Sequence, residues 1–360
     1  MVTAFRLFRI CRTGHGLTNK QFYEREARNI KSTAIRLGRS LIINSIKIVS
    51  LLLAVTFIAF MLVSLSPVDP VQQYLLGLGT AISPEQRVEI EQYWGLNEPS
   101  AERYFSWLGE ILKGNWGESL LYRRPVMDII SECFANSLAL MLCAWLFSGL
   151  IGFSLGCLMG MYQGRWPDKL LKKICYLMSS LPSFWLGLLL LLVFSVWLNI
   201  FPIGFSAPIG LAESEVSLWQ RLHHLILPAF TLSMVSFANI SLHTRQKLIE
   251  VLDSDYALFA RARGEGPWTV LRRHGIRNIL LPALTIQFAS LAELFGGSVL
   301  AENVFSYPGL GSAVSAAGLN SDLPLFLGIT LFSALFVCVG NMTANLLYGV
   351  IDPRIQEAHR

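Results

Sequence analysis

The sequence predicts an all-α polytopic membrane protein with six transmembrane helices. Three observations predict it: an apolar composition, six long apolar stretches, and basic residues gathered in alternate links between them. Of 360 residues, 53% are hydrophobic and 15% are charged, and the mean hydropathy is +0.50. A soluble domain of this length would need more charge to cover its surface. We therefore expect a lipid membrane, and no nucleic acid, as a partner.

Six stretches are long and apolar enough to cross about 30 Å of hydrocarbon, which takes roughly 20 helical residues. Within lipid the backbone must satisfy its own polar groups, so each stretch should be a helix. The fourth is the least apolar, because Asn239 and several serines and threonines dilute it. The expected spans are 42–64, 136–162, 175–198, 225–243, 279–301 and 324–350.

Lys and Arg residues predict the orientation of these spans. The first 47 residues hold ten Lys/Arg and two acids, whereas 65–135 holds five Lys/Arg and ten acids. The link 163–174 has four basic residues and 244–278 has seven, but 302–323 has none. Both termini are therefore predicted to be cytoplasmic, in a multi-pass protein of the inner (plasma) membrane, with 65–135 and 302–323 outside.

The same pattern divides the chain into three parts. A basic N-terminal extension covers 1–41, the six-span domain covers 42–350, and a cytoplasmic tail covers 351–360. The extension is either a basic interfacial helix or a disordered tail. It is too polar for a signal peptide. The six cysteines are scattered without a Cys-x-x-Cys pair, which indicates packing residues.

The segment 65–135 has the pattern of a small helical cap outside the membrane. Ser83 followed by Pro84 and Gln86 predicts a helix start, with Ser83 as N-cap and the proline in the first turn. A second helix is expected from Ser100 to Leu112. Its apolar face would be Tyr104, Phe105, Leu108, Ile111 and Leu112. Such a cap either receives a partner or packs as a lid on the spans.

The cytoplasmic link 244–278 predicts a short helix-turn-helix. Residues 256–263 are good helix formers, 264–267 (Gly-Glu-Gly-Pro) break the helix, and 268–277 restart it with Pro267 in the first turn. The apolar side is expected to carry Phe259, Trp268, Val270 and Leu271, and the other side Arg261, Arg263, Arg272 and Arg273. The spacing alone leaves two possibilities open, a lipid surface or a groove in a cytoplasmic partner.

Motifs in order along 42–356 resemble the inner-membrane permeases of binding-protein-dependent ABC importers, in the dipeptide/oligopeptide/nickel branch. The link resembles the coupling-loop signature of that branch through Ala260-Arg261-Ala262-Arg263-Gly264, Leu271-Arg272-Arg273-His274 and Arg277-Asn278. The other matching stretches are 66–70 (SPVDP), 107–109 (WLG), 114–117 (GNWG), 124–126 (RPV), 181–185 (LPSFW), 225–228 (LILP), 302–311 (ENVFSYPGLG) and 352–354 (DPR).

The resemblance implies a type I ABC importer permease fold and a transport subunit that is not itself an enzyme. The chain has no Gly-Lys pair, which rules out a Gly-x-x-x-x-Gly-Lys phosphate loop, so ATP and Mg would be bound by partners. Implied partners are two cytoplasmic ATPase subunits or domains, a second homologous permease, and a solute-binding protein. The residues implied in coupling to the ATPase are Tyr256, Ala260, Arg261, Ala262, Arg263, Gly264, Trp268, Leu271, Arg272, Arg273 and His274.

Three positions depart from the family pattern. After Gly264 the family usually has Leu and Ser, where this chain has Glu265 and Gly266, which adds an acid to the turn. The last span usually carries an Asp where this chain has Asn345, so an ion pair of the family is not expected there.

Glu293 is the single acid inside a predicted span. Because carboxylates in hydrocarbon are costly, they usually face a bundle interior or a water-filled cavity. Glu293 is then either a path-lining group that favours a cationic or metal-chelate substrate, or a structural partner of a group on another helix. Asn136 and Gln287 are further candidates for the translocation path.

No metal site is expected on this chain. Adjacent His223 and His224 would point about 100° apart on a helix, and no third ligand is near in sequence, which favours interfacial anchors. A secondary transporter or channel subunit is the alternative function, but such folds usually have more spans or internal repeats. The substrate stays open between a peptide, a nickel complex and a metallophore chelate.

Overall fold

The computed structural model describes residues 45–78, 83–93, 97–211 and 215–351, so the predicted extension 1–41 and nearly all of the tail 351–360 lie outside the described residues. The chain divides into two units, Met1–Ala54 and Val55–Arg360. Everything below belongs to the second unit, except the first residues of the helix Ser45–Ser64. The described elements are helices and none is a strand, which confirms the all-α class.

The candidate membrane spans reach the predicted number. Four unbroken helices qualify as spans, and two bent helix pairs bring the number to six if each pair is counted as one span. One pair is α7 (Trp166–Ser180) with α8 (Ser183–Leu190) and its π-helical continuation η1 (Leu191–Trp197). The other joins Pro267–Leu291 to Glu293–Val304, the last part of α12 (Ile276–Val304). The four unbroken ones are the helix Ser45–Ser64, α6 (Val126–Met161), α9 (Leu218–Leu252) and α14 (Leu323–Ile351).

The third span differs from the prediction of one continuous stretch over 175–198. The helical segments on either side of Leu181-Pro182 meet at 111°, and Leu181 is extended, with ψ of 141°. Pro182 causes this break, because proline lacks a backbone N–H and disfavours helical geometry at the residue before it. The second half of α12 is also turned, by 54°.

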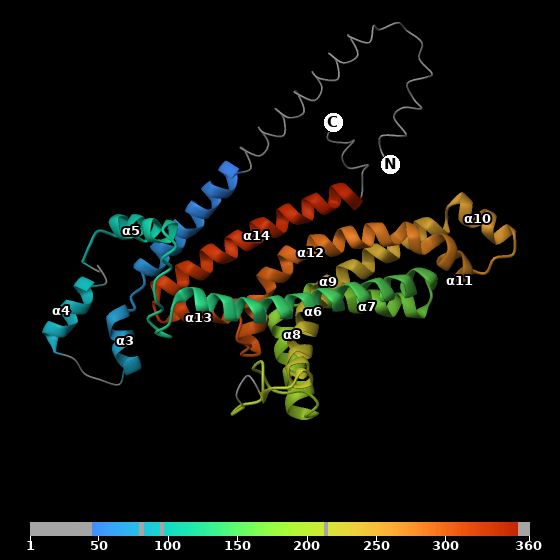
Figure 1. Ribbon diagram of the computed structural model, residues 1–360. Coiled ribbons are helices and arrows are strands. Elements are labelled where there is room, and N and C mark those ends of the chain that lie inside the picture. Colours follow the sequence, from blue (N-terminus) through green and yellow to red (C-terminus); the bar gives the residue numbers. More distant parts are fainter. Residues whose placement is uncertain (1–44, 79–82, 94–96, 212–214, 352–360) are drawn as a thin grey trace, which may run out of the picture. The chain divides into compact units, whose positions relative to one another are not determined.

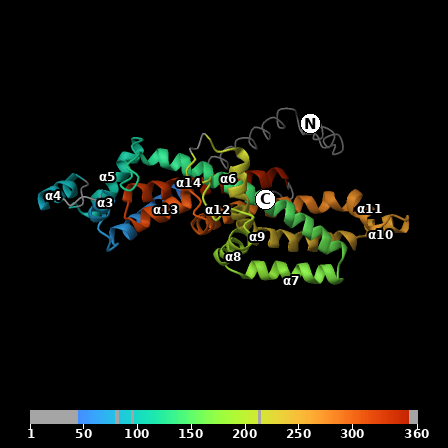
Figure 2. The same ribbon diagram turned by 90° about the horizontal axis from the view of Figure 1, so that it is seen from below.

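Helices α6, α9 and α12 run side by side along most of their length (Figures 1 and 2). Helix α6 meets α9 through a seam of glycines, where a Cβ on Gly156 would lie 2.5 Å from the Cβ of Thr244. A Cβ on Gly152 would lie 2.9 Å from Ile240 Cβ, and one on Gly160 would lie 2.7 Å from Leu248 Cδ2. The small side chains therefore let the α6 and α9 backbones pack tightly.

The two ends of this bundle carry different structures. One end, here called the α13 end, carries α3 (Pro70–Leu78), α4 (Pro84–Tyr93), α5 (Ser100–Leu112) and α13 (Leu310–Leu319) (Figure 1). The other, called the α10 end, carries α10 (Asp255–Ala262) and α11 (Pro267–Val270).

Helices α4 and α5 of the predicted cap begin at the residues that the sequence pattern predicted. Ser83 Oγ accepts from the Gln86 N–H, and Gln86 Oε1 accepts from the Ser83 N–H, which completes the expected capping box. Helix α5 has the predicted bounds and packs through Tyr104, whose hydroxyl is 2.9 Å from Thr56 Oγ1. Of the residues on the predicted apolar face, Phe105 and Leu112 are 66% and 82% exposed.

Candidate functional site

The α10 end of α9 leads directly into a short helix. Ser254 is the N-cap of α10, and its carbonyl accepts from the backbone N–H groups of Ala257 and Leu258. The small side chains of Ala257 and Ala260 are buried, which allows α10 to lie against the segment that follows it. The short helix α10, whose inner side is buried, is thereby attached to the end of the long helix α9.

Gly264 ends α10 in a Schellman turn. The Gly264 N–H donates to Arg261 O at 2.9 Å, and the Glu265 N–H donates to Ala260 O at 3.1 Å. Gly264 has φ of +88°, in the left-handed region that glycine adopts without the Cβ penalty of other residues. The expected turn after residue 263 is confirmed.

The chain then restarts a helix that continues without a break into a span. Gly266 is the N-cap of α11 and Pro267 occupies the first position, as predicted. Helix α11 runs into the π-helical turn η3 (Leu271–Gly275), which runs into α12. Val270 and Leu271 are buried, and Leu271 packs with Leu248 and Ile279 at the ends of α9 and α12. The segment after the turn is therefore part of the bundle.

The predicted apolar face is divided in two. Val270 and Leu271 face inward, whereas Phe259 is 73% exposed and Trp268 is 55% exposed. The exposed side also carries Leu258, Tyr256, Arg261, Arg263, Arg272 and Arg273, and Ala262 is exposed among them. We call the exposed set Tyr256, Leu258, Phe259, Arg261, Arg263, Trp268, Arg272 and Arg273 the α10–α11 face.

The acid that departs from the family pattern lies beside this face. Glu265 Oε1 is 3.7 Å from Arg273 Nη1, and its Oε2 is 3.4 Å from His274 Nε2. Glu265 Oε2 has no hydrogen bond to a described residue. The added acid thus lies across the turn from two of the predicted coupling residues, in loose contact with both.

A buried ion pair fixes the bundle just before this turn. Arg245 of α9 donates two hydrogen bonds to Asp168 of α7, from Nε to Oδ1 at 2.6 Å and from Nη2 to Oδ2 at 2.7 Å. The Asp168 side chain is 1% exposed and also accepts from the Gly164 N–H at 2.8 Å. Such a two-pronged pair holds α7 and α9 in one relative position.

The three candidate path residues lie in different surroundings. Glu293 is exposed on α12 and makes no hydrogen bond or ion pair with a described residue. Gln287 is 5% exposed and donates from Nε2 to Trp145 O and to Ser148 Oγ on α6. Asn136 is half-buried and donates to Pro308 O at 2.9 Å. The structure does not bring the three into one cluster.

Glu302 is a buried residue whose structural role sequence reasoning missed, although it begins one of the matching motifs. It is 0% exposed; Ser137 of α6 donates to Oε1 at 2.7 Å, and the Gly311 and Ser312 N–H groups donate to Oε2 at 2.6 and 3.1 Å. This arrangement, called the Glu302 joint, ties α6, α12 and the start of α13. A signal was present, because the acid ends an apolar stretch and is followed by Pro-Gly-Leu-Gly.

The glycines of that motif make room for the carboxylate. A Cβ on Gly309 would lie 2.3 Å from Glu302 Cδ, and one on Gly311 would lie 2.4 Å from Val299 Cα. The histidines that were predicted as anchors also bind loops: His223 Nε2 lies 2.9 Å from Ile200 O, and His224 Nδ1 lies 2.8 Å from Gly204 O.

Two family models match this chain. The model described as binding-protein-dependent transport system inner membrane component matches residues 152–357, and the corresponding N-terminal model matches 37–141. The first covers the α10–α11 face, Glu302 with its partners on α13, and four of the candidate spans.

Curated relatives agree with these matches. The oligopeptide transport system permease protein AppB of Bacillus subtilis is 34% identical over 309 residues, which are 86% of this chain and 96% of the relative. The dipeptide permease DppB of Alkalihalophilus pseudofirmus is 32% identical, over 86% of this chain and 96% of the relative. The di/tripeptide permease DppB of Pseudomonas aeruginosa is 33% identical, over 84% and 94%. This chain therefore belongs to the inner-membrane permeases of binding-protein-dependent transport systems, the family of ABC importer permeases that the sequence motifs predicted.

Proposed function

We propose that this chain is one of two permease subunits of an ATP-driven peptide importer. The support for a peptide cargo is that the three relatives above are described as oligopeptide, dipeptide and di/tripeptide permeases. Nickel or a metal chelate appears in none of these three descriptions, so peptide is the cargo proposed here. A binding protein would deliver the peptide, and a second homologous permease would complete the path.

The α10–α11 face is the observation that carries this proposal. Phe259 and Trp268 are large, exposed and flanked by arginines on a segment whose other side is buried. Aromatic residues and Arg are enriched at protein interfaces, where apolar side chains enter a groove and charged groups form its rim. A complementary groove would have an apolar floor and an acidic rim, and an ATPase subunit is the partner that the family implies.

The continuity of α11, η3 and α12 supports a mechanism. Leu271 is anchored against α9 and α12, no loop separates α11 from α12, and α10 packs against α11 through Ala257, Ala260 and Val270. Closure of two ATPase subunits around ATP and Mg would therefore move the face and α12 together, as a rigid element that changes access to the path. In this arrangement the α10 end and both termini are cytoplasmic.

The three candidates for the translocation path differ in how well their surroundings support a place on that path. The exposed carboxylate of Glu293 is free of described partners within its own chain, which supports a place at the path or at the second permease. Asn136 and Gln287 remain path candidates, but the hydrogen bonds from Gln287 to α6 favour helix packing for that residue.

The test is to express this chain with its second permease and tagged ATPase subunits, and to measure ATPase co-purification and uptake of labelled peptide. We expect Phe259→Ala/Trp268→Ala to reduce both by about tenfold or more, as removal of interface anchors does. The matched control is Trp219→Ala, because Trp219 is 71% exposed but lies at the start of α9. Undiminished co-purification with the double variant would refute the docking assignment.

A second arm addresses the cargo. The wild-type transporter with its binding protein should take up labelled peptide, and excess unlabelled peptide should compete while excess nickel should not. Uptake of nickel without uptake of peptide would overturn the peptide assignment and leave the ATPase docking face intact.

A further inference from the structure

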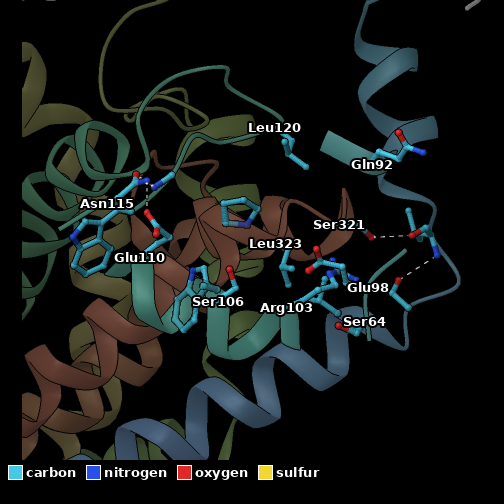
Figure 3. Close-up of a pocket in the computed structure, with 17 residues that line it drawn as sticks. Ser64, Gln92, Glu98, Arg103, Ser106, Glu110, Asn115, Leu120, Ser321 and Leu323 are labelled. Carbon is cyan, nitrogen blue, oxygen red and sulfur yellow. Dashed lines mark hydrogen bonds between the residues drawn. The ribbon is translucent and has the colours of Figure 1, made fainter. Parts of the chain in front are cut away.

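A cavity of about 640 Å³ lies at the α13 end, where α5, the end of the helix Ser45–Ser64 and the start of α14 meet (Figure 3). Small-molecule sites typically have volumes of roughly 300–1,000 Å³. Its walls combine two indole rings with polar side chains. Among the lining residues are Ser64, Glu98, Arg103, Trp107, Trp116 and Ser321.

Hydrogen bonds hold the walls in place. Glu110 Oε2 accepts from Asn115 Nδ2 at 3.1 Å, and Asn115 Oδ1 accepts from the Gly117 N–H at 3.1 Å. Asp322 is fully buried and accepts from the Leu121 N–H at 2.9 Å and from the Leu325 N–H at 3.2 Å, which joins the wall loop to α14. The cavity is therefore preformed, as binding sites usually are.

Arg103 is the principal cation of this cavity. Its guanidinium lies over the Phe60 ring, with Cζ 5.8 Å from the centroid, and makes no hydrogen bond or ion pair with a described residue. Burial lowers the pKa of the Arg103 guanidinium, and the charge of nearby Glu98 opposes that shift. Five N–H donors are thus half removed from water without an acceptor, an arrangement that an anionic acceptor would stabilise.

Two more donors at the wall lack partners. The Trp107 Nε1–H and the Ser64 hydroxyl are buried, and neither makes a hydrogen bond to a described residue. Glu98 is exposed and lies beside Arg103 in the cavity (Figure 3). The cavity therefore offers a donor-rich wall, a carboxylate next to it, and apolar ring surfaces.

We propose that this cavity binds the C-terminal end of a short zwitterionic peptide, with Arg103 as the partner of the peptide carboxylate. The planar fork of a guanidinium matches a carboxylate in two parallel hydrogen bonds. Glu98 is placed to attract the peptide ammonium group, and the indoles of Trp107 and Trp116 offer surface to apolar side chains. This inference rests on the proposed peptide cargo and adds a site on the permease itself.

The experiment uses the purified transporter complex in nanodiscs, without binding protein. Trialanine and trialanine amide are titrated by isothermal calorimetry, because the two peptides differ only in the carboxylate. We expect trialanine to bind about tenfold more tightly than its amide, a ratio typical for loss of one charge-assisted pair. Arg103→Gln should remove this discrimination, and Arg103→Lys should leave an intermediate preference because Lys has no fork.

The matched control is Arg124→Gln. Arg124 is another arginine of the α13 end, but it is exposed and paired with Glu132, so its loss should leave the preference unchanged. The unfolding temperature of each variant is measured in parallel, and the comparison of acid with amide needs no variant at all. Absence of trialanine binding, equal affinity for acid and amide, or an undiminished preference in Arg103→Gln would each overturn the inference.

Failure of the inference can be told from failure of the proposed function. If the complete wild-type system imports trialanine but the cavity tests are negative, only the cavity assignment falls. If the complete system imports no peptide, the proposed cargo falls, whatever the calorimetry gives.

Discussion

Two glutamates at opposite ends of the bundle are held in opposite ways. In the Glu302 joint the carboxylate is fully buried and accepts hydrogen bonds at both oxygens. Glu265 at the α10 end lies 3.4 Å or more from its basic neighbours, and its Oε2 accepts no hydrogen bond from a described residue. Polar bonds therefore fix the start of α13, whereas backbone geometry and apolar anchors fix the turn between α10 and α11 and leave the carboxylate of Glu265 without a close partner.

The largest expected effect is at the Glu302 joint. Glu302→Ala removes the acceptor of Ser137 Oγ and of the Gly311 N–H, which are buried, and of the Ser312 N–H, which is partly buried. Because each orphaned buried donor costs about 1–3 kcal/mol, we expect destabilisation by about 3 kcal/mol or more. The unfolding temperature in detergent and the amount of protein in membranes measure it.

Glu302→Gln is the matched control for this loss. It keeps one carbonyl acceptor, so its destabilisation should be smaller than that of Glu302→Ala. Wild-type stability in Glu302→Ala would show that the joint is not what holds α6, α12 and α13 together.

The intermediate effect is at the turn of the α10 end. Gly264→Ala forces a residue with a Cβ to φ of +88°, at a cost of roughly 1–2 kcal/mol, although no atom lies within 4 Å of the added Cβ. We expect peptide uptake to fall several-fold while membrane insertion is unchanged, because the turn orients the α10–α11 face.

Gly266→Ala separates backbone strain from side-chain bulk. Gly266 has φ of −71°, and a Cβ there also meets nothing within 4 Å, so this variant should transport normally. Equal uptake by the two alanine variants would remove the turn geometry from the mechanism.

The smallest expected effect is at Glu265. Because its contacts with Arg273 and His274 are long, Glu265→Gln should change the unfolding free energy by no more than about 0.5 kcal/mol. Uptake should stay within about twofold of wild type on the same ground. A large loss of uptake would mean that Glu265 acts on the partner. Glu265 would then differ from Glu302 in having a direct role in transport, and not only in being less rigidly held.

Local chemistry was enough to predict the features that depend on neighbours in sequence. The capping box at Ser83, the bounds of α5 and the turn at Gly264 each need only three to six consecutive residues, and the structure confirms them. The number of six spans follows from hydropathy for the same reason, provided that each bent helix pair is counted as one span, since each span is formed by residues that are neighbours in sequence.

Features that depend on distant neighbours could not be predicted in this way. Phe259 and Val270 are both apolar, but only Val270 meets residues that other elements place beside it. Glu302 gains its acceptor role from Ser137 on another helix. The break at Pro182 was not predicted for a different reason: hydropathy averaged over a window is insensitive to the missing backbone N–H of one proline.

The glycine seam between α6 and α9 has a mechanical consequence. Backbones packed this closely leave no space for one helix to slide or rotate against the other without collision, as at Gly156 and Thr244. A transporter must nevertheless open to each side of the membrane in turn. The α6–α9 pair should therefore travel as one piece, and the displacement that opens a path should be taken up where this chain meets its neighbours.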